Sequence, residues 1–419
     1  MDVVIVGQGY VGLPLAVAAA QAGHRVVGVD TDPRRVESLA AGLSPVGDIT
    51  DVDLKSVLAD GRYRASESVE AVANADVVVL CVPTPYHNDA PDLSFLESAA
   101  TAVAGHLTPQ TLVILESTTY PGTTEDILAP LLEQVSGLKV GTDVLLAFSP
   151  ERIDPGNPVY GIRNTPKIVG GMTPPATAGA AEFYRTFIDA VVEVSGPKTA
   201  EMAKLLENTF RHINIALVNE LAILSRELGV DIWEVIDAAA SKPFGFMPFY
   251  PGPGVGGHCI PVDPMYLSWR VRQFGAAAKF IELARDVNSA MPLYCVARVQ
   301  EILNDRRLAL RGSRVLVVGV TYKRDVADMR ESPALPLMRG LVGKGAMVEY
   351  HDPYVPHLEL DGAELSSTPL TPEAVSAADC VVIVTDHRAV KLEPVLAGST
   401  PVLDTRAALQ PGKPNVQRL

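Results

Sequence analysis

A cysteine in a loop rich in glycine and proline is the clearest chemical signal in this sequence. Residues 249–264 read FYPGPGVGGHCIPVDP and place Cys259 beside His258 and four residues before Asp263. Glycine lets the backbone come close to a ligand, and proline excludes a regular helix or central strand, so we expect a shaped, rigid loop. A thiol there is positioned like a nucleophile; a small residue in an ordinary turn is the alternative.

The sequence around the other three cysteines does not indicate a reactive thiol. Cys81 and Cys380 lie in apolar, strand-like runs, and Cys295 lies in a predicted helix. We therefore expect buried, reduced thiols at these positions. The spacing of the cysteines and histidines predicts neither a zinc site nor a disulfide framework.

Three polar residues share one face of a predicted long helix. The helix covers residues 199–228, which contain neither Gly nor Pro, and Lys204, Asn208 and Arg211 follow at i, i+4 and i+7. An ammonium, an amide and a guanidinium in a row suit an anionic substrate or a developing oxyanion. The alternative is an ordinary solvent-exposed face, which would usually carry more Glu.

The N-terminal residues predict a dinucleotide site. An apolar strand at residues 2–6 leads into a GxGxxG turn, and a helix ended by Gly23 follows. The three glycines of the turn are Gly7, Gly9 and Gly12. In this context they let a pyrophosphate approach the positive end of the helix, whereas a lone GxGxxG would be weak evidence.

The second predicted strand, at residues 25–30, ends at Asp30. This carboxylate lies near the expected offset of about 20 residues beyond the glycine turn and can accept hydrogen bonds from ribose hydroxyls. An acidic residue here favours NAD over NADP, although Arg34 and Arg35 lie nearby. A Gly-rich turn without a ligand is the alternative.

Polar residues follow the next predicted strands, which alternate with helices as in a doubly wound α/β sheet. Thr118 and Glu151 stand shortly after two of these strands, at the edge where open α/β sheets bind ligands. Either could orient a water molecule; a turn residue and a solvated charge are equal alternatives. The strands cover residues 76–82, 112–116 and 144–148.

From Ser313 the α/β pattern returns as a second Rossmann-like fold that lacks the glycine turn. Lys323, Arg324 and Arg330 cluster after its first strand, where a phosphate usually sits. A solvated basic loop is the alternative. Beside an N-terminal NAD fold, the cluster predicts a site for a phosphorylated substrate.

The chain has 419 residues, which is too long for one domain. We predict an α/β protein with two Rossmann-like, doubly wound domains joined by a central helical domain with a long helix. The predicted bounds are residues 1–196 for the NAD-binding domain, 197–303 for the central domain with the cysteine loop, and 304–419 for the third domain. The central helices could serve dimerisation.

The formal net charge of −14 argues against a general nucleic-acid surface, so any phosphate site must be a local basic island. No run reaches the roughly 18 uncharged apolar residues of a membrane span, and the first residues lack a basic leader. We therefore expect a cytoplasmic protein with no nucleic-acid or membrane partner.

Taken together, these segments resemble the UDP-glucose/GDP-mannose dehydrogenase family along essentially the whole chain. The resemblance rests on GQGYVGLPLA, CVPTP, ESTTYPGTT, KLLENTFRHINIALVNE, GGHCIPVDP and GVTYKRDVADMRESPAL. SPERIDPGN and PFGFMPFYPGPGVGGHCIPVDP look more like the branch that oxidises UDP-N-acetylhexosamines, above all UDP-N-acetylglucosamine 6-dehydrogenases. UDP-glucose enzymes usually show FLxEG and GFGGSCFPKD at these places, so the departure concerns the sugar and not the chemistry.

The resemblance implies a four-electron oxidation of a sugar C6 alcohol to a carboxylate, with two NAD+ as acceptors. Cys259 would add to the intermediate aldehyde, and the thiohemiacetal would be oxidised to a thioester that water releases. By similarity, Lys204 and Asn208 would stabilise the oxyanion-like intermediates. Three further residues would handle water and proton transfers: Asp263, Thr118 and Glu151.

The same resemblance implies two sets of binding residues and a homodimer formed through the central helix, in which Arg211 could act across subunits. NAD would contact Gly7, Gly9, Tyr10, Val11, Gly12, Asp30, Arg35, Pro83, Thr84 and Thr118. The UDP-sugar substrate would contact Glu151, Arg152, Lys204, Asn208, Arg211, Phe249, Tyr250, Gly252, Gly256, Lys323 and Arg406, with Lys323 on the UDP phosphates.

Other functions stay open at this point. Within the family, UDP-glucose and UDP-N-acetylmannosamine are alternative substrates. A β-hydroxyacid dehydrogenase shares an N-terminal Rossmann domain followed by helices, but it would use a lysine without a thiol and would leave the third domain unexplained. A non-catalytic protein that binds NAD and a sugar nucleotide is a third alternative, although it would not need Cys259.

Overall fold

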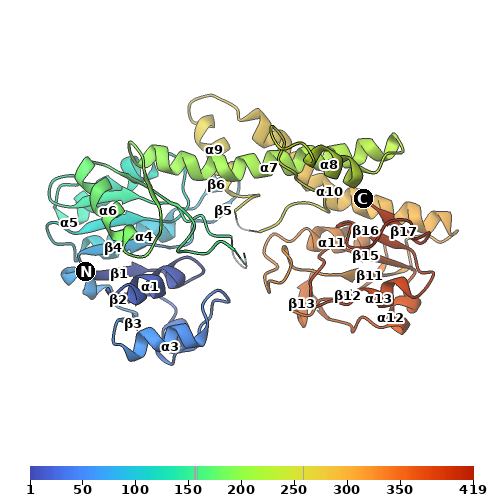
Figure 1. The fold of residues 1–419 in the computed structure, drawn as a ribbon, viewed down its shortest axis with the longest axis horizontal. Helices are drawn as coiled ribbons and strands as arrows, with labels where there is room; N and C mark the ends of the chain where they lie inside the picture. The colour runs from blue at the N-terminus through green and yellow to red at the C-terminus, as the bar shows by residue number, and fades with distance from the viewer. Residues whose placement is uncertain (155–156, 158, 258) are drawn as a thin grey trace. The chain divides into compact units, whose positions relative to one another are not determined.

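The structure, a computed structural model, describes residues 1–154, 157, 159–257 and 259–419, so His258 lies outside the described residues. The chain divides into two compact units (Figure 1). Unit 1 comprises Met1–Glu207 and Tyr266–Ala276, and unit 2 comprises Asn208–Met265 and Ala277–Leu419.

Unit 1 is built around an eight-stranded sheet. In spatial order the strands are β10 (Val191–Glu193), β9 (Lys167–Gly171), β8 (Leu145–Phe148), β7 (Leu112–Leu115), β4 (Val77–Leu80), β1 (Asp2–Val6), β2 (Arg25–Val29) and β3 (Tyr63–Ser66). Neighbouring strands run parallel except β8 and β9, which pair antiparallel. The central strands β1, β4 and β7 are runs of Val, Ile and Leu, which is typical of a parallel sheet covered on both faces.

Helices cover both faces of this sheet. They are α1 (Gly12–Gln21), α2 (Pro33–Ala40), α3 (Asp51–Ala59), α4 (Ser94–Ala104), α5 (Ala129–Ser136) and α6 (Pro174–Arg185), with helical turns η1 (Glu70–Asn74) and η2 (Thr124–Leu128) and a hairpin of β5 (Tyr86–His87) and β6 (Ala90–Pro91). Alternate residues along the strands point to opposite faces of the sheet and pack into two separate apolar clusters. Leu13 of α1 and Phe183 of α6 belong to one, and Leu96 of α4 and Leu132 of α5 to the other.

Unit 2 contains a five-stranded parallel sheet in the order β12 (Met347–His351), β11 (Arg314–Val318), β15 (Cys380–Ile383), β16 (Val402–Asp404) and β17 (Val416–Arg418). Its other elements are α8 (Ile232–Ala240), α10 (Lys279–Asp305), α11 (Ala334–Gly343), α12 (Pro372–Ala377), α13 (Glu393–Leu396), β13 (His357–Leu360) and β14 (Ala363–Ser366). The strand order reverses between β11 and β15, and ligands bind at the carboxyl ends of the strands at such a point.

Two helices carry residues of both units, namely α7 (Pro197–Glu227) and α9 (Asp263–Arg272). The predicted long helix is α7, which begins two residues earlier than expected because proline is tolerated in the first turn of a helix. Two Rossmann-like sheets and this long helix confirm the predicted fold class. Among the described helices, none combines the length and the apolar character that crossing a bilayer requires.

Two sequence-based expectations are corrected. The loop expected over residues 249–264 ends at Val262, because Asp263 and Pro264 form the first turn of α9, where proline costs little. Cys81, expected to be buried, has intermediate exposure because it lies just beyond the end of β4, whereas Cys295 and Cys380 are buried as expected.

Candidate active site

The glycine turn after β1 leaves room for a ligand at the N-terminus of α1. Gly7 has φ +93°, and a Cβ there would lie 2.3 Å from the carbonyl oxygen of Cys81. A Cβ at Gly12 would lie 1.8 Å from the carbonyl oxygen of Gly7, so neither position tolerates a side chain. A Cβ at Gly9 would meet no described heavy atom within 4 Å. This open space before a helix N-terminus fits the pyrophosphate of a dinucleotide.

Asp30 is held in place at the end of β2. Its Oδ2 accepts hydrogen bonds from the backbone N of Gln8 (2.8 Å) and from Nη1 of Arg35 (3.0 Å), and its Oδ1 accepts one from the backbone N of Asp32 (3.0 Å). The carboxylate is thereby fixed beside the glycine turn, where it can bind ribose hydroxyls. Arg35 is thus paired with Asp30, whereas Arg34 is exposed and paired with Asp32.

Hydrogen bonds tie the segments after β4 and β7 to each other. Thr84 donates from Oγ1 to the carbonyl oxygen of Thr118 (2.7 Å), and Ser117 donates from Oγ to the carbonyl oxygen of Val82 (2.8 Å). The hydroxyl of Tyr266, on α9, donates to the carbonyl oxygen of Thr84. The structure thus brings together Thr84 and Thr118, which were predicted from separate segments.

Glu151 is surrounded by donors and is not a solvated charge. Its Oε1 accepts hydrogen bonds from the backbone N of Arg152 and of Ile153, both at 2.6 Å, and its Oε2 lies 3.1 Å from Nζ of Lys167. The ammonium of Lys204 donates to the backbone carbonyl oxygen of Glu151 at 2.5 Å. Two residues predicted from separate segments, Lys204 and Glu151, are therefore in contact within unit 1.

Lys167 connects Glu151 to a second, fully buried carboxylate, Glu116. Nζ of Lys167 lies 3.0 Å from Oε1 of Glu116, which also accepts a hydrogen bond from the hydroxyl of Tyr184. Burial alone would raise the pKa of Glu151, but Lys167, backbone hydrogen bonds and Lys204 outweigh it and hold that pKa below its usual value. Burial raises the pKa of Glu116. The surroundings of Glu151 therefore favour its ionised form, whereas burial opposes ionisation of Glu116.

Arg152 joins the segment after β8 to the first half of α7. Its Nε and Nη2 donate to the two carboxylate oxygens of Glu207 at 3.1 and 2.5 Å, and its Nη1 donates to the carbonyl oxygen of Pro166 at 2.5 Å. These contacts fix the backbone next to Glu151. The substrate contact implied for Arg152 stays a prediction.

In unit 2 the cysteine loop leads directly into α9. Cys259 is exposed, and its carbonyl oxygen accepts hydrogen bonds from the backbone N of Asp263 (2.8 Å) and of Val262 (3.3 Å). Asp263 is buried, and its Oδ2 accepts a hydrogen bond of 2.5 Å from Nδ2 of Asn208. A thiol, a carboxylate and an amide thus lie on segments that are bonded to one another.

The three polar residues of α7 do not share one environment. Lys204 and Asn208 are only 8% and 5% exposed, so they do not form the solvent-exposed face that was the alternative interpretation. Arg211 is exposed. The two buried residues therefore need polar partners inside the protein, and Glu151 and Asp263 supply them.

Two predicted positions of the cysteine loop pack closely against other segments. A Cβ at Gly252 would lie 2.5 Å from Nη1 of Arg406, and a Cβ at Gly256 would lie 2.6 Å from the carbonyl oxygen of Glu331. The backbone N of Gly252 donates to Oδ1 of Asn219 on α7 at 2.9 Å. The structure thus brings the loop and Arg406, both predicted to bind substrate, into contact within unit 2.

Arg406 is held by the sheet of unit 2. Its Nε donates to the carbonyl oxygen of Val384 at 2.8 Å. Burial lowers its pKa to about 10, which leaves the guanidinium charged at neutral pH. A cation is therefore fixed next to the glycine loop.

Two aromatic residues at the start of the loop pack against helices. The ring of Phe249 lies edge-on to Phe210 of α7, with centroids 5.6 Å apart. Tyr250 stacks on Trp233 of α8 at 5.5 Å and donates from its hydroxyl to Asp237 at 2.8 Å. These contacts anchor the loop, and the implied substrate contacts of both residues stay predictions.

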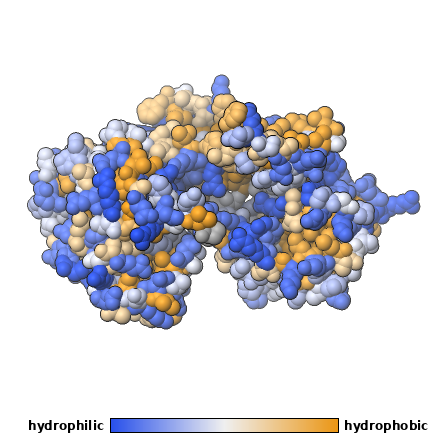
Figure 2. Space-filling model, viewed as in Figure 1, coloured by the Kyte–Doolittle hydropathy of each residue, from blue (hydrophilic) through white to orange (hydrophobic). Residues whose placement is uncertain are grey.

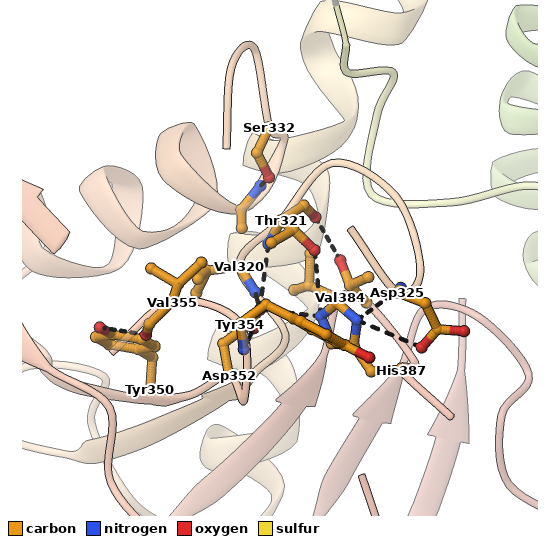
Figure 3. A network of polar contacts seen from close by, with 12 residues as sticks. Val320, Thr321, Asp325, Ser332, Tyr350, Asp352, Tyr354, Val355, Val384 and His387 are labelled. Carbon is orange, nitrogen blue, oxygen red and sulfur yellow. Dashed lines mark hydrogen bonds and ion pairs between the residues drawn. The ribbon is translucent and has the colours of Figure 1, made fainter. Parts of the chain in front are cut away.

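The basic cluster follows β11, beside a buried polar network (Figure 3). Arg324 forms an ion pair with Asp386, and Arg330 forms one with Asp328 at 2.7 Å. Two of the three predicted basic residues are therefore neutralised by carboxylates of the same unit. Lys323, the third, has intermediate exposure.

The sequence analysis overlooked several polar residues that hold this site together. Three of them stand within four residues after a strand, so the rule that singled out Thr118 and Glu151 would have found them as well. Lys167 opens an apolar strand, and a charge in such a run requires a buried partner. No sequence pattern distinguishes the two asparagines, which lie within α7 and α10. These residues are Glu116, Asp352, His387, Lys167, Asn219 and Asn288.

Three family models match the chain. They describe the NAD binding domain (residues 1–188), the central domain (residues 198–290) and the UDP binding domain (residues 316–411) of the UDP-glucose/GDP-mannose dehydrogenase family. Together they span most of the chain and include the glycine turn, the cysteine loop and the basic cluster.

Similar proteins cover nearly the full length. UDP-N-acetyl-D-mannosamine dehydrogenase of Pyrococcus horikoshii is 37% identical over 390 residues, which is 92% of this chain and 90% of that protein. UDP-N-acetyl-D-glucosamine 6-dehydrogenase of Pseudomonas aeruginosa is 35% identical over 389 residues, with the same coverage. The solved structure of UDP-D-ManNAc dehydrogenase from Pyrococcus horikoshii matches with a TM-score of 0.91 at 34% identity, covering 100% of this chain and 98% of that one.

These matches confirm the resemblance drawn from the sequence motifs and the predicted cofactor, NAD. They agree with a glycine turn that has room for a pyrophosphate and with an acidic residue fixed at the end of β2. The chain belongs to the UDP-glucose/GDP-mannose dehydrogenase family and is an NAD-dependent oxidoreductase.

Proposed function

We propose that this protein is a UDP-N-acetylhexosamine 6-dehydrogenase that oxidises the C6 alcohol of UDP-N-acetylglucosamine or UDP-N-acetylmannosamine to a carboxylate. The names of the similar proteins support this substrate class. One observation carries the proposal. Cys259 is exposed, and its carbonyl oxygen accepts a hydrogen bond from the backbone N–H of Asp263. The carboxylate of Asp263 in turn accepts a hydrogen bond from the side-chain amide of Asn208. A protein that only binds its ligands would not need a thiol in this setting.

The proposed reaction consists of two oxidations joined by a covalent step. Bound NAD+ supplies a hydride acceptor for C6 in each oxidation. Loss of the hydroxyl proton and the first hydride gives an aldehyde. The thiolate of Cys259 adds to the aldehyde carbon, and the carbonyl oxygen takes up the proton that the hydroxyl gave up, which forms a thiohemiacetal. Loss of the second hydride and a proton gives a thioester. Water then attacks the thioester, which frees the sulfur and leaves the carboxylate.

The other polar residues predicted to be catalytic have separate roles in this proposal. Lys204 and Asn208 donate to the oxyanions that develop on the C6 oxygen. Glu151 and Thr118 orient water, and Asp263 accepts and returns protons. The low pKa of Glu151 supports its part, because an ionised carboxylate accepts hydrogen bonds from water.

The proposed substrate site uses residues of unit 2. Lys323 contacts the diphosphate, and Arg406 and the loop at residues 249–254 contact the sugar nucleotide. The close packing of Gly252 against Arg406 supports this grouping. Arg211, which is exposed, would reach the substrate of a second subunit.

We also propose the three-domain division predicted from the sequence, with an NAD-binding domain at residues 1–196, a central domain at 197–303 and a UDP-sugar-binding domain at 304–419. The ranges of the three family models support this division.

A homodimer through α7 completes the proposal. Apolar side chains of α7 are exposed at spacings of seven, four, three and four residues, which places them on one stripe. They are Phe210, Leu217, Leu221, Leu224 and Leu228, the last just beyond the helix end. Figure 2 shows apolar surface where α7 and α8 lie. A second copy of this helix would cover such a stripe.

The test is to measure NADH release with UDP-N-acetylglucosamine, UDP-N-acetylmannosamine, UDP-N-acetylgalactosamine, UDP-glucose and GDP-mannose. We expect two NADH per UDP-N-acetylhexosamine consumed, and a uronate product by mass spectrometry. One NADH per substrate would contradict the four-electron reaction. Preference for UDP-glucose would overturn the substrate class, and no reduction with any sugar nucleotide would favour a binding protein.

A further inference from the structure

The loop after β11 occupies the position that the glycine turn occupies in unit 1, but it is shaped by side chains. Gly319 is the one glycine at its start, and a Cβ there would lie 2.1 Å from the carbonyl oxygen of Thr385. The following residues, 320–325, read VTYKRD and contain no glycine. Their backbone must therefore be fixed by partners from neighbouring strands.

Asp352, at the end of β12, binds the start of this loop. Its Oδ2 accepts hydrogen bonds from the backbone N of Val320 at 2.7 Å and of Thr321 at 3.4 Å. The same oxygen lies 3.0 Å from Nε2 of His387, which follows β15. The side chains of Asp352 and His387 are both 0% exposed, so neither can replace these contacts with water.

His387 binds the far end of the loop with its other nitrogen. Nδ1 lies 2.9 Å from the backbone N of Asp325, and a backbone N–H can only donate, so Nδ1 carries no proton. Nε2 therefore carries the proton and donates to Asp352. Figure 3 shows the imidazole between Asp352 and Asp325, beside Tyr354. One side chain thus joins the ends of β12 and β15 to the loop after β11.

Asp325 needs this support because of its backbone. Its φ is +61°, a left-handed conformation that residues with a side chain adopt less readily than glycine. Two hydrogen bonds hold it there: its N–H to His387, and its Oδ1 from the backbone N of Arg388 at 2.9 Å. Thr321 donates from Oγ1 to the carbonyl oxygen of Lys323 at 2.9 Å. The backbone is therefore held by hydrogen bonds at Lys323 itself and, two residues later, at Asp325.

We propose that His387 is a positioning residue for the diphosphate of the sugar nucleotide, because it fixes residues 320–325 so that Lys323 is presented at the carboxyl edge of the sheet. The loop lies between β11 and β15, where the strand order reverses and ligands bind. Asp352 corresponds to Asp30, which binds the start of the glycine turn in unit 1, and His387 supports a turn that here lacks the further glycines. The inference rests on the proposed contact between Lys323 and the UDP diphosphate.

The test compares UDP affinity by calorimetry in the full-length His387→Ala, His387→Asn and His387→Gln variants. Asn can place an oxygen near the position of Nδ1 and keep the bond to Asp325, whereas Gln reaches toward the position of Nε2. We expect His387→Ala to weaken UDP binding about tenfold or more, since a buried hydrogen bond is lost at each end. His387→Asn should bind UDP more tightly than His387→Gln, and the KM for NAD+ should change less than about twofold.

Unchanged UDP affinity in folded His387→Ala would overturn the inference, as would equal losses for UDP and NAD+. If His387→Ala does not fold, the test rests on His387→Asn and His387→Gln. Equal UDP affinities in these two variants would overturn the inference. Lys323→Ala separates this inference from the proposed function. Normal UDP binding in Lys323→Ala would contradict the proposed contact of Lys323 with the diphosphate. If Lys323→Ala binds UDP weakly while all three His387 variants bind it normally, only the role of His387 is contradicted.

Discussion

Asn208 of α7 donates a 2.5 Å hydrogen bond from Nδ2 to Oδ2 of Asp263, the first residue of α9. Both side chains are buried, so neither can exchange this partner for bulk water at low cost. The bond links a proposed oxyanion donor to the residue whose N–H is bonded to the carbonyl oxygen of Cys259. A change at Asn208 therefore acts on the carboxylate that follows the thiol.

Replacing Asn208 by Ala should lower kcat for the UDP-sugar by about 10- to 100-fold, because a hydrogen bond to a charged group contributes about 1.5–3 kcal/mol. Steady-state NADH release measures this. Asn214→Ala is the matched control on the same helix, since the side-chain amide of Asn214 donates to the carbonyl oxygen of Phe210 on the exposed side of α7. Equal kcat in the two variants would contradict the role of the Asn208–Asp263 pair.

Alkylation should distinguish Cys259 from the other cysteines. Burial raises the pKa of Cys295 and of Cys380 to about 12 and also raises the pKa of Cys81 well above its usual value, so all three thiols stay protonated at pH 8. Iodoacetamide should therefore modify the exposed Cys259 first, and activity should fall in step with that modification, as followed by peptide mass spectrometry. Full activity with Cys259 completely alkylated would rule out the thioester route.

Because Lys167 is buried between two carboxylates, replacing it should lower the stability of the protein by an amount that depends on pH. Lys167→Met leaves Glu116 and Glu151 without their shared cation, which should cost about 3–5 kcal/mol of unfolding free energy at pH 7. Without Lys167 the folded-state pKa of Glu116, which burial already raises above its unfolded value, rises further, and that of Glu151 is no longer held down by this cation. The folded variant therefore binds more protons, and the loss of stability shrinks as pH falls from 7 toward 5.

Urea unfolding at pH 7 and pH 5 measures this difference. Lys167→Arg is the control, because a guanidinium keeps the positive charge between the two carboxylates. An equal loss at both pH values would show that packing, and not charge, accounts for the effect of Lys167→Met.

Asp30 should decide between NAD+ and NADP+. Asp30→Ala removes the proposed ribose acceptor and releases Arg35 from its ion pair, so the KM for NAD+ should rise about tenfold and NADP+ should become a usable acceptor. Steady-state kinetics with both cofactors test this. Asp32→Ala serves as the control because Asp32 is the N-cap of α2 and pairs with Arg34. A KM for NAD+ that rises equally in both variants would contradict the assignment.

The apolar stripe of α7 predicts the oligomeric state. Leu217→Asp and Leu224→Asp together should convert a dimer into monomers, because each places a charge in the proposed contact. Light scattering after size-exclusion chromatography gives the mass. Val52→Asp, on the exposed surface of α3, is the control and should leave the mass unchanged. A wild-type protein with the mass of one chain would exclude the proposed dimer.

The sequence predicted those parts of the fold that local patterns encode. The strand, glycine turn and helix at the N-terminus were located because apolar runs and the GxGxxG spacing act over a few residues, and the long helix because residues 199–228 lack Gly and Pro. The end of the cysteine loop was placed two residues too late, since proline was counted as a helix breaker although the first turn of a helix accepts it.

The partners of the site residues could not be predicted in this way. The contact of Lys167 with Glu116 and Glu151 joins β9 to the ends of β7 and β8, and only the pairing of these strands brings the three side chains together. His387 and Asp352 are 35 residues apart and meet because β12 and β15 flank the same strand. Contacts of this kind depend on sheet order, which a single sequence does not contain.

The packing of Gly252 against Arg406 has a mechanical consequence. The guanidinium of Arg406 occupies the place that a Cβ at position 252 would need. Any side chain at that position would therefore have to displace the arginine or the loop backbone. A substitution there would disturb a cation and the segment that leads to the thiol at the same time.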